Sequence, residues 1–330
     1  MALAPQRILV TGATGFVGRH LLPRLRQEFP GAALLATGRT GVPEALPEGL
    51  RADALLPLDL ERPEDMDALV RDAAPDAVVH LAAQAAVGES FAHPGRTWRM
   101  NLLGTIGLAE AAMRHAPQAP FLFISSAEVY GLSFRDIETP LTELAPMQPA
   151  NPYAASKAAC DIALGEMALR GLRCLRMRPS NHAGAGQSEN FVISAFARQI
   201  ARIEAGLQEP VMRVGALDRW RDFLDVRDVC AAYALVLRAA PELPAGSVFN
   251  VASGTSRRIG DILAALLRRS RVAVRVEEDA ARLRPTDVLR TAGDATRLRE
   301  ALGWRPGTSW DETLDTVLAD WRARVAAGAA

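Results

Sequence analysis

Short apolar runs alternate with amphipathic stretches through the first half of the chain, and this alternation restricts the fold more than any other feature. Each run suits a buried strand, and each stretch between runs suits a helix that covers the strands. The expected strands are residues 7–11, 33–37, 54–58, 76–81, 120–125 and 172–177, and the expected helices are residues 16–28, 63–73, 94–115 and 152–170. This order predicts an α/β fold, a doubly wound parallel sheet with helices on both faces.

The pattern changes after about residue 178. Residues 180–190 are expected to form a polar loop, and residues 221–226 and 247–251 two further strands. The expected helices there are residues 191–206, 227–239, 258–270, 294–302 and 310–327. We therefore expect a domain built mainly from residues 1–180, to which segments near 215–252 return. Residues 181–330 would form mainly a smaller, mostly helical substrate lobe.

Three glycines stand directly between the first strand and the first helix, in Thr-Gly-Ala-Thr-Gly-Phe-Val-Gly at residues 11–18. Glycines there allow a tight turn, close approach of the backbone to a pyrophosphate, and close packing of helix on sheet. The helix N-terminus also offers N–H groups to phosphates. The sequence thus predicts a Rossmann-type dinucleotide site at Gly12, Thr14, Gly15, Phe16, Val17 and Gly18.

The ends of the next strands are expected to contact the rest of the dinucleotide. The second strand leads into Arg39 without a carboxylate for a ribose 2′-hydroxyl, and an arginine there can pair with a 2′-phosphate. This favours NADP(H), with NAD(H) possible and a surface role for Arg39 as the alternative. Further expected contacts are Asp59, Leu60, Leu81, Ala82 and Ala83. Asp59 suits a helix cap equally well.

Lys157 is the single lysine among 38 basic residues, and it lies four positions after Tyr153. On a helix this spacing places both side chains on one face, one turn apart. A nearby ammonium lowers the pKa of a phenol towards the range of a general acid. Ser126, at the end of the fifth strand, can hydrogen-bond a substrate carbonyl, although alone it suits a strand-end cap. With Glu128, these residues form the expected catalytic group.

The bulk composition excludes several classes of function. Formal net charge is zero and the isoelectric point is near 7, so binding of nucleic acid is not expected. The three cysteines lack the spacing of metal ligands, which predicts reduced thiols and no metal. The sequence shows no signal peptide and no apolar run of membrane length, so a cytoplasmic protein without a membrane partner is expected.

Taken together, these motifs resemble the extended short-chain dehydrogenase/reductases along nearly the whole chain. The matching segments are Thr-Gly-x-x-Gly-x-x-Gly at 11–18, Leu-Ala-Ala at 81–83, Asn-Leu-Leu-Gly-Thr at 101–105, Ser-Ser-x-x-Val-Tyr-Gly at 125–131, Tyr-x-x-x-Lys at 153–157 and Arg-Asp-Phe-Leu-Asp-Val at 221–226. Residues 178–188, 199–206 and 284–288 look like the GDP-mannose branch. The resemblance implies a GDP-sugar substrate between the lobes and a homodimer packed through helices near 95–115 and 153–170.

The resemblance also implies roles for individual residues of the second half. Asn181 would contact the sugar, and Arg221 and Arg284 would hold the diphosphate. Ser126, Glu128 and Tyr153 would contact the substrate as well, and His182 would lie near the nicotinamide end of the cofactor. One departure is Ala216, where this branch usually has asparagine, which leaves the nucleotide contacts of that loop open.

Residue 127 separates the activities of this branch. A 4,6-dehydratase removes a proton from C5 and protonates the departing C6 hydroxyl, whereas Ala127 beside Glu128 provides no such proton donor. The resemblance then implies an NAD(P)H-dependent oxidoreductase that reduces the C4 ketone of GDP-4-keto-6-deoxy-D-mannose, with GDP-D-rhamnose as the expected product. The alternatives are a GDP-mannose 4,6-dehydratase, a nucleotide-sugar 4-epimerase and a non-catalytic dinucleotide sensor. The stereochemistry at C4, the cofactor preference and dimer versus tetramer stay open.

Overall fold

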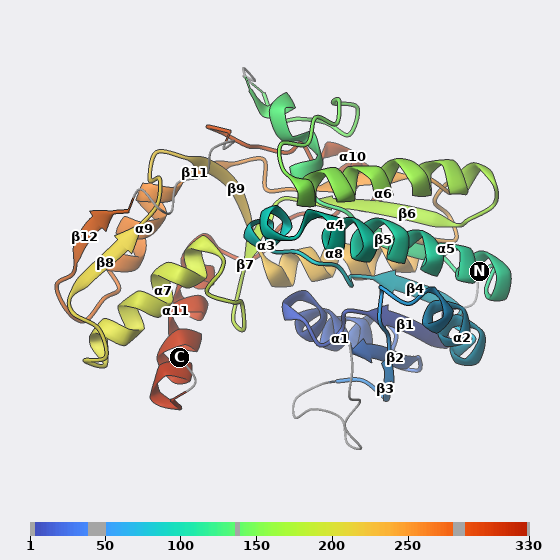
Figure 1. Cartoon of the computed structure of the whole chain (residues 1–330), viewed down its shortest axis with the longest axis horizontal. Helices are drawn as coiled ribbons and strands as arrows, with labels where there is room; N and C mark the ends of the chain where they lie inside the picture. The colour runs from blue at the N-terminus through green and yellow to red at the C-terminus, as the bar shows by residue number, and fades with distance from the viewer. Residues whose placement is uncertain (1–3, 39–50, 136–138, 280–287, 329–330) are drawn as a thin grey trace.

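A seven-stranded parallel sheet forms the centre of the larger lobe (Figure 1). The computed structural model describes residues 4–38, 51–135, 139–279 and 288–328. The strands are β1 (Arg7–Thr11), β2 (Ala33–Gly38), β3 (Ala54–Pro57), β4 (Ala77–His80), β5 (Phe121–Ile124), β6 (Cys174–Pro179) and β10 (Val248–Val251). Their order across the sheet is β10-β6-β5-β4-β1-β2-β3. The predicted doubly wound α/β fold is confirmed, and the order reverses beside β1, where ligands bind in such sheets.

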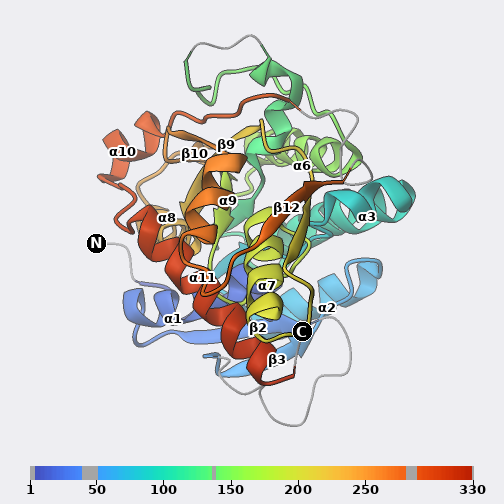
Figure 2. The same ribbon diagram turned by 90° about the vertical axis from the view of Figure 1, so that its left-hand side faces the viewer.

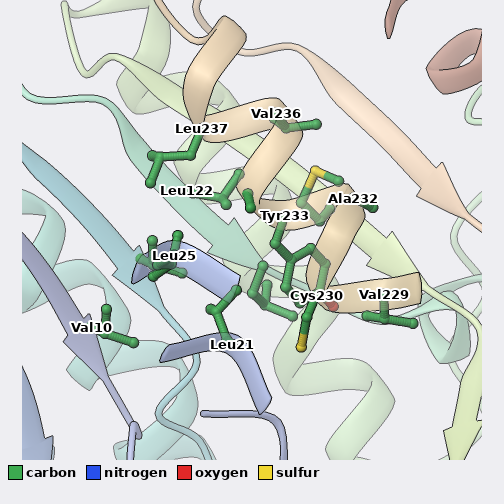
Figure 3. Packing of buried hydrophobic residues seen from close by; sticks show 14 of the residues in the cluster. Val10, Leu21, Leu25, Leu122, Val229, Cys230, Ala232, Tyr233, Val236 and Leu237 are labelled. Atoms are coloured by element: carbon green, nitrogen blue, oxygen red, sulfur yellow. The ribbon is translucent and has the colours of Figure 1, made fainter. Parts of the chain in front are cut away.

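Helices cover both faces of this sheet because its buried strands alternate their side chains between two cores. On one side, Ile8 and Val10 of β1 pack with α1 (Phe16–Glu28) and α8 (Val226–Ala239), as Figure 3 shows for this cluster. On the other side, Leu9 packs with the helices of the second layer. These are α2 (Pro63–Ala73), α5 (Gly104–His115) and α6 (Pro152–Leu169).

The predicted helix 94–115 is interrupted in the structure. It consists of α4 (Pro94–Trp98), a π-helical turn η1 (Arg99–Leu103) and α5. Asn101, in the middle of η1, donates through Nδ2 to Ser156 Oγ at 2.9 Å, and its carbonyl accepts from Cys160 Sγ at 3.1 Å. These bonds attach the π-helical turn to α6. The short helix α3 (Val87–Ala92) and the 3-10 segment η2 (Ala127–Phe134) were not predicted.

The second lobe contains more strands than the sequence indicated. Its helices α7 (Val192–Glu204), α9 (Ile259–Leu267) and α11 (Trp310–Ala326) pack into one core, and Figure 2 shows α7 and α11 side by side. A parallel pair, β8 (Val211–Val214) and β12 (Arg275–Glu278), lies against them. A separate three-stranded sheet consists of β7 (Asn181–Ala183), β9 (Trp220–Asp225) and β11 (Ser256–Arg258), with β9 in the middle. Of these strands only β9 was predicted, and β7 replaces the start of the polar loop that was expected over residues 180–190. Helices still make up most of the regular structure of this lobe, as predicted.

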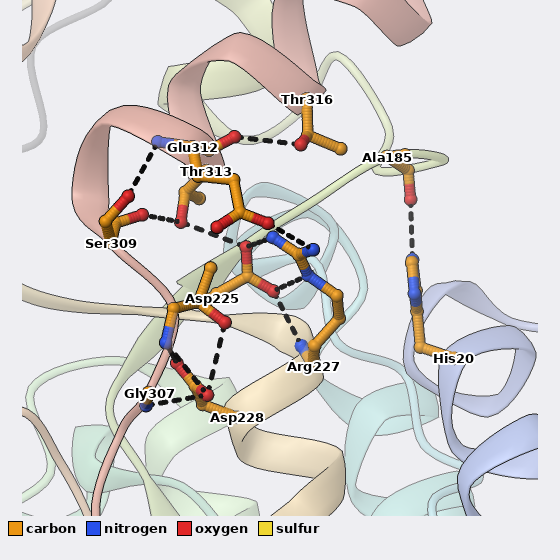
Figure 4. Close-up of polar contacts among 11 residues, drawn as sticks. His20, Ala185, Asp225, Arg227, Asp228, Gly307, Ser309, Glu312, Thr313 and Thr316 are labelled. Atoms are coloured by element: carbon orange, nitrogen blue, oxygen red, sulfur yellow. Dashed lines mark hydrogen bonds and ion pairs between the residues drawn. The ribbon is translucent and has the colours of Figure 1, made fainter.

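Polar contacts at the start of α8 join the two lobes (Figure 4). Asp225 caps α8 by accepting the N–H of Arg227 at 2.8 Å, and it also accepts the hydroxyl of Thr313 on α11 at 2.9 Å. Arg227 reaches Glu312 on the same helix at 2.8 Å. The end of β9 therefore has a fixed position relative to both lobes. Within the described ranges, none of the helices has the length and apolar character that crossing a membrane requires.

Candidate functional site

The glycine loop lies at the carboxyl end of β1, against the segment that follows β4. Gly12 has φ of +68°, and a Cβ there would lie 2.8 Å from the backbone nitrogen of Ala82. A Cβ on Gly18 would lie 2.4 Å from the carbonyl oxygen of Ala13, which explains the close packing of α1 on the loop. Gly15 caps α1 without a side-chain hydrogen bond. The N–H groups at the start of α1 are therefore available to a phosphate.

A buried histidine, which the sequence analysis did not single out, supports this loop. His80 Nδ1 lies 2.7 Å from Thr11 Oγ1, and Nε2 lies 2.9 Å from Thr105 Oγ1 on α5. Thr11 Oγ1 also accepts the N–H of Ala82 at 3.2 Å. Burial, and secondarily the charge of Lys157, lowers the pKa of His80 to about 3, so the ring is neutral and fixes the loop by hydrogen bonds.

The other expected cofactor contacts lie around the same edge of the sheet. Leu81–Ala83 follow β4 directly, and the N–H of Leu81 donates to the carbonyl of Thr11 at 3.2 Å. Asp59 accepts the N–H of Glu61 at 3.0 Å and so has a local role before α2, and buried Leu60 packs against Gly104. Thr14 and Val17 belong to the loop and the first turn of α1. Arg39 lies outside the described residues.

Ser126, Tyr153 and Lys157 meet where β5 ends beside α6. The hydroxyl of Ser126 hydrogen-bonds the phenol of Tyr153. Lys157 is buried one turn further along α6, and its Nζ donates to the carbonyl of Ile124 at 2.6 Å and lies 4.7 Å from the centre of the Phe123 ring. The structure thus brings together three of the four residues expected to act in catalysis.

The protonation of this group differs from the expectation. Burial raises the pKa of Tyr153 to about 12, while the hydrogen bond from Ser126 lowers it and the charge of Glu128 raises it. Burial lowers the pKa of Lys157 to about 8, and Cys160 and Asp161 raise it. The prediction that Lys157 lowers the pKa of the phenol is therefore wrong for the protein alone, because Lys157 points to the β5 carbonyl. The phenol is a proton donor at neutral pH.

Glu128 also belongs to this group, through the residue that caps α6. The side chain of Asn151 accepts the N–H of Ala154 at 2.8 Å and donates to Glu128 Oε2 at 3.3 Å. The N–H of Glu128 in turn donates to Ser126 Oγ at 3.1 Å. Asn151 was not predicted as a site residue, although asparagine before proline at a helix start signals a cap.

Beneath Lys157, a buried ion-pair network supports α6. Asp161 has no exposed surface and accepts two hydrogen bonds from Arg178, at 2.9 and 2.8 Å, and one from Arg176 at 3.0 Å. Arg178 also donates to the hydroxyl of Tyr130 at 3.0 Å. This bidentate geometry satisfies the carboxylate and places a negative charge one turn from Lys157. None of the sequence motifs indicated this network.

Two of the residues expected to contact the substrate, Asn181 and Arg221, lie on the three-stranded sheet. Asn181 on β7 is opposite Phe223 on β9, and Arg221 lies two residues earlier on β9. His182 lies on the other face, where its ring stacks on Phe16 with 6.1 Å between centroids. Burial lowers the pKa of His182, so it is neutral beside the glycine loop. Arg284 lies outside the described residues.

Two buried oxygens at this edge have no hydrogen-bond partner within the described structure, Gln84 Oε1 and Ser125 Oγ. Gln84 follows β4 and Ser125 follows β5, so both lie beside the glycine loop and Ser126. Unsatisfied polar atoms, a loop without room for a Cβ and an uncapped helix start together fit a dinucleotide. The described residues hold no group of three or more histidine, cysteine, aspartate or glutamate side chains that suits a metal ion.

A hollow of about 690 Å³ lies elsewhere, between β8 and β12. Its lining consists of Glu209, Pro210, Val211, Ala273, Val274 and Arg275. None of the expected site residues within the described ranges borders it. The arrangement of polar groups at the strand ends therefore defines the candidate site better than the size of this hollow does.

Comparison with known proteins agrees with this geometry. The family described as GDP-mannose 4,6 dehydratase matches residues 9–317. The chain is 39% identical to GDP-6-deoxy-D-mannose reductase of Pseudomonas aeruginosa, over 97% of this chain and 98% of that one. It is 31% identical to a UDP-glucose 4-epimerase of Mycolicibacterium smegmatis, over 93% and 96%.

Among solved structures, the chain is similar to RMD from Pseudomonas aeruginosa in complex with NADPH. The TM-score is 0.83 and the identity 37%, over 97% of this chain and 99% of that one. A match of this extent covers nearly the whole of both chains. The chain therefore belongs to the GDP-mannose 4,6-dehydratase family, within the extended short-chain dehydrogenase/reductases.

Proposed function

We propose that this protein uses NADPH to reduce the C4 ketone of GDP-4-keto-6-deoxy-D-mannose, forming GDP-D-rhamnose. The observation that carries the proposal is the side chain at position 127, a methyl group beside Glu128. Removal of the C6 hydroxyl needs a proton donor and a base beside the sugar, whereas ketone reduction needs one donor. The similarity to GDP-6-deoxy-D-mannose reductase along both full chains supports this choice.

The donor in this mechanism is the phenol of Tyr153. With a pKa of about 12 it is protonated at neutral pH, and the oxygen that forms at C4 takes its proton. Ser126, hydrogen-bonded to the phenol, contacts the same oxygen and stabilises its developing charge. The buried ammonium of Lys157 adds a positive charge to the floor of the site. Glu128, held by Asn151, orients a sugar hydroxyl.

The glycine loop, the start of α1 and the Leu81–Ala83 segment would hold the dinucleotide, and Phe16 and His182 would flank it. A bound nicotinamide supplies the hydride for C4. Arg39 is proposed to select the 2′-phosphate, which agrees with the NADPH in the related Pseudomonas structure. Arg284 is proposed to contact the diphosphate. Both arginines lie outside the described residues.

We also propose that the protein acts as a homodimer in the cytoplasm. Leu103, Ile162 and Leu169 are 60%, 62% and 89% exposed on η1 and α6, within the helices expected to pair. Apolar side chains gathered on one helical surface favour burial against a second copy. Cys160, Cys174 and Cys230 are buried free thiols, which suits a reducing compartment.

The test supplies the purified protein with GDP-4-keto-6-deoxymannose and NADPH, follows nicotinamide absorbance and identifies the sugar by NMR. Loss of NADPH in step with a C4-reduced product is expected, and the NMR spectrum distinguishes rhamnose from 6-deoxytalose. Tyr153→Phe serves as the matched control because it keeps the ring and removes the donor. Absence of NADPH loss, with ketone formed from GDP-mannose instead, would identify a 4,6-dehydratase and overturn the proposal.

A further inference from the structure

The side chain of Asn151 makes two hydrogen bonds that lead in different directions. Its Oδ1 accepts the N–H of Ala154 at 2.8 Å, and its Nδ2 donates to Glu128 Oε2 at 3.3 Å. The backbone at Asn151 is extended, with φ of −152° and ψ of 162°, and its carbonyl accepts the N–H of Ala155 at 2.9 Å. Asn151 is therefore a complete N-cap of α6, and the second bond of its amide leaves the helix.

Asparagine differs from the other residues that cap helices because its amide is both an acceptor and a donor without being charged. Ser126, Asp225 and Ser309 cap η2, α8 and α11 as acceptors. An aspartate in place of Asn151 would cap α6 equally well and suit the positive end of the helix dipole. It would, however, place a second carboxylate against Glu128. The amide therefore serves Glu128 as well as the helix.

Glu128 is bonded through both its backbone and its carboxylate. Its N–H donates to Ser126 Oγ at 3.1 Å, and its Oε2 accepts from Asn151. Ser126 also hydrogen-bonds the phenol of Tyr153. Ser126 and Glu128 lie at the start of η2, whereas Tyr153 lies on α6, and 23 positions separate Glu128 from Asn151. Asn151 thus links the carboxylate of one segment to the helix that carries the proton donor.

The backbone of η2 is held by other contacts. Tyr130 is fully buried, and its hydroxyl donates at 2.7 Å to an asparagine side chain of β10. The N–H of Leu132 donates to the carbonyl of Gln148 at 2.8 Å. Loss of the Asn151 amide should therefore release the Glu128 side chain and leave the segment in place.

We propose that Asn151 is a positioning residue that acts through Glu128, holding one carboxylate oxygen so that the other accepts a hydroxyl of the sugar. The inference rests on the proposed function, since it assumes a sugar beside Glu128. A glutamate side chain with one oxygen fixed loses less rotamer freedom when the substrate binds. The bond acts before and during hydride transfer alike. It should therefore strengthen substrate binding without changing proton donation by Tyr153.

The test compares Asn151→Ser and Asn151→Asp by steady-state kinetics and thermal unfolding. Both changes keep a side-chain oxygen for the cap, but serine removes the donor to Glu128 and aspartate replaces it by a negative charge. KM for GDP-4-keto-6-deoxymannose should rise about 10-fold in Asn151→Ser and further in Asn151→Asp, with kcat unchanged. The melting temperature of Asn151→Ser should stay close to that of the wild type.

Ser309→Ala is the matched control for loss of a cap. Ser309 Oγ accepts the N–H of Glu312 at 3.2 Å and caps α11 in the second lobe. This change should lower the melting temperature and leave KM unchanged.

A second readout is independent of turnover. Calorimetry with GDP-mannose should show about 10-fold weaker binding in Asn151→Ser, whereas the affinity for GDP should stay the same, because GDP lacks the sugar that Glu128 would contact. In a Glu128→Ala background, Asn151→Ser should cause no further loss of affinity for GDP-mannose, because no carboxylate is left to hold.

Equal KM values in the wild type, Asn151→Ser and Asn151→Asp would make Asn151 a helix cap alone and overturn the inference. The inference would also fail if the loss in Asn151→Ser added in full to that in Glu128→Ala, or extended to GDP. Wild-type protein that binds GDP-mannose with the help of Asn151 but leaves the 4-ketone unreduced would overturn the proposed function alone. Wild-type protein that neither reduces the ketone nor binds GDP-mannose would overturn both.

Discussion

Replacing Asp161 by asparagine is expected to lower the pH at which the enzyme loses activity on the alkaline side. Burial lowers the pKa of Lys157 to about 8, and Cys160 and Asp161 raise it. Burial raises the pKa of the Cys160 thiol to about 11, so of these two groups only Asp161 carries a charge near neutral pH. The phenol of Tyr153, with a pKa of about 12, stays protonated throughout. Alkaline loss of activity should therefore report deprotonation of Lys157.

The size of the effect follows from the position of Asp161 on α6. Side chains one helical turn apart have their charges about 6 Å from each other. Two unit charges at that distance interact by about 3 kcal/mol at an effective dielectric constant of about 20, which corresponds to a pKa shift of about two units. Arg176 and Arg178 share this carboxylate and offset part of its field. We therefore expect the midpoint of the alkaline loss of activity to move down by about one pH unit in Asp161→Asn. The change also leaves Arg178 without its ion pair, which should cost about 3 kcal/mol of stability.

The assay is the pH dependence of kcat/KM for ketone reduction, with thermal unfolding of the same samples. Asp228→Asn is the matched control, because Asp228 is another buried carboxylate. It accepts the N–H groups of Gly307 and Thr308 at 3.0 and 3.1 Å and is absent from the charges that act on Lys157. That variant should lose stability and keep the wild-type midpoint. A folded Asp161→Asn protein with an unchanged midpoint would refute the role given to Asp161.

Three further results are expected. Tyr153→Phe should lower kcat by about 10²- to 10⁴-fold and keep dinucleotide binding, measured by turnover and nicotinamide fluorescence; wild-type turnover would exclude Tyr153 as donor. The pKa of His80 is lowered to about 3, so the unfolded state binds more protons between about pH 3 and 6.5. The free energy of unfolding should therefore decrease by up to roughly 5 kcal/mol as the pH is lowered through that window. In urea unfolding, the His80→Gln protein should lose less stability on acidification than the wild type, and an equal loss of stability would contradict this role of His80. The Tyr233 hydroxyl is buried without a hydrogen-bond partner in the described structure. Tyr233→Phe should therefore add about 1 kcal/mol to the free energy of unfolding and raise the melting temperature by about 2 °C. A lower melting temperature would show that the hydroxyl has a stabilising partner.

The parts of the fold that were predicted correctly depend on local signals. The bounds of α1 and α2 match the expected helices, since a glycine loop precedes one and a proline opens the other. The break at η1 could not be predicted, because Asn101 in this turn makes hydrogen bonds with Ser156 and Cys160, more than fifty residues away. Strands of three residues, β7 and β11, are too short to show an alternating pattern and form through distant partners.

The candidate site divides in the same way. Tyr153 and Lys157 share one helix, so their spacing alone places them together. His80 and Asp161 gain their importance from neighbours that the register of strands and the packing of helices determine. The pKa of Tyr153 was predicted in the wrong direction for the same reason, because burial and the direction of the Lys157 side chain are properties of the folded site.

The return of the chain to the large sheet limits how this enzyme can be altered by recombination. The edge strand β10 and the covering helix α8 both come from beyond residue 180, and they complete the layer over Leu21 and Leu25 of α1. A chimaera that joined the first half of this chain to the second half of a relative would exchange part of that core along with the sugar site. A new nucleotide-sugar preference is therefore better introduced as side chains on β7 and β9, where Asn181 and Arg221 lie, than as a contiguous half of another chain.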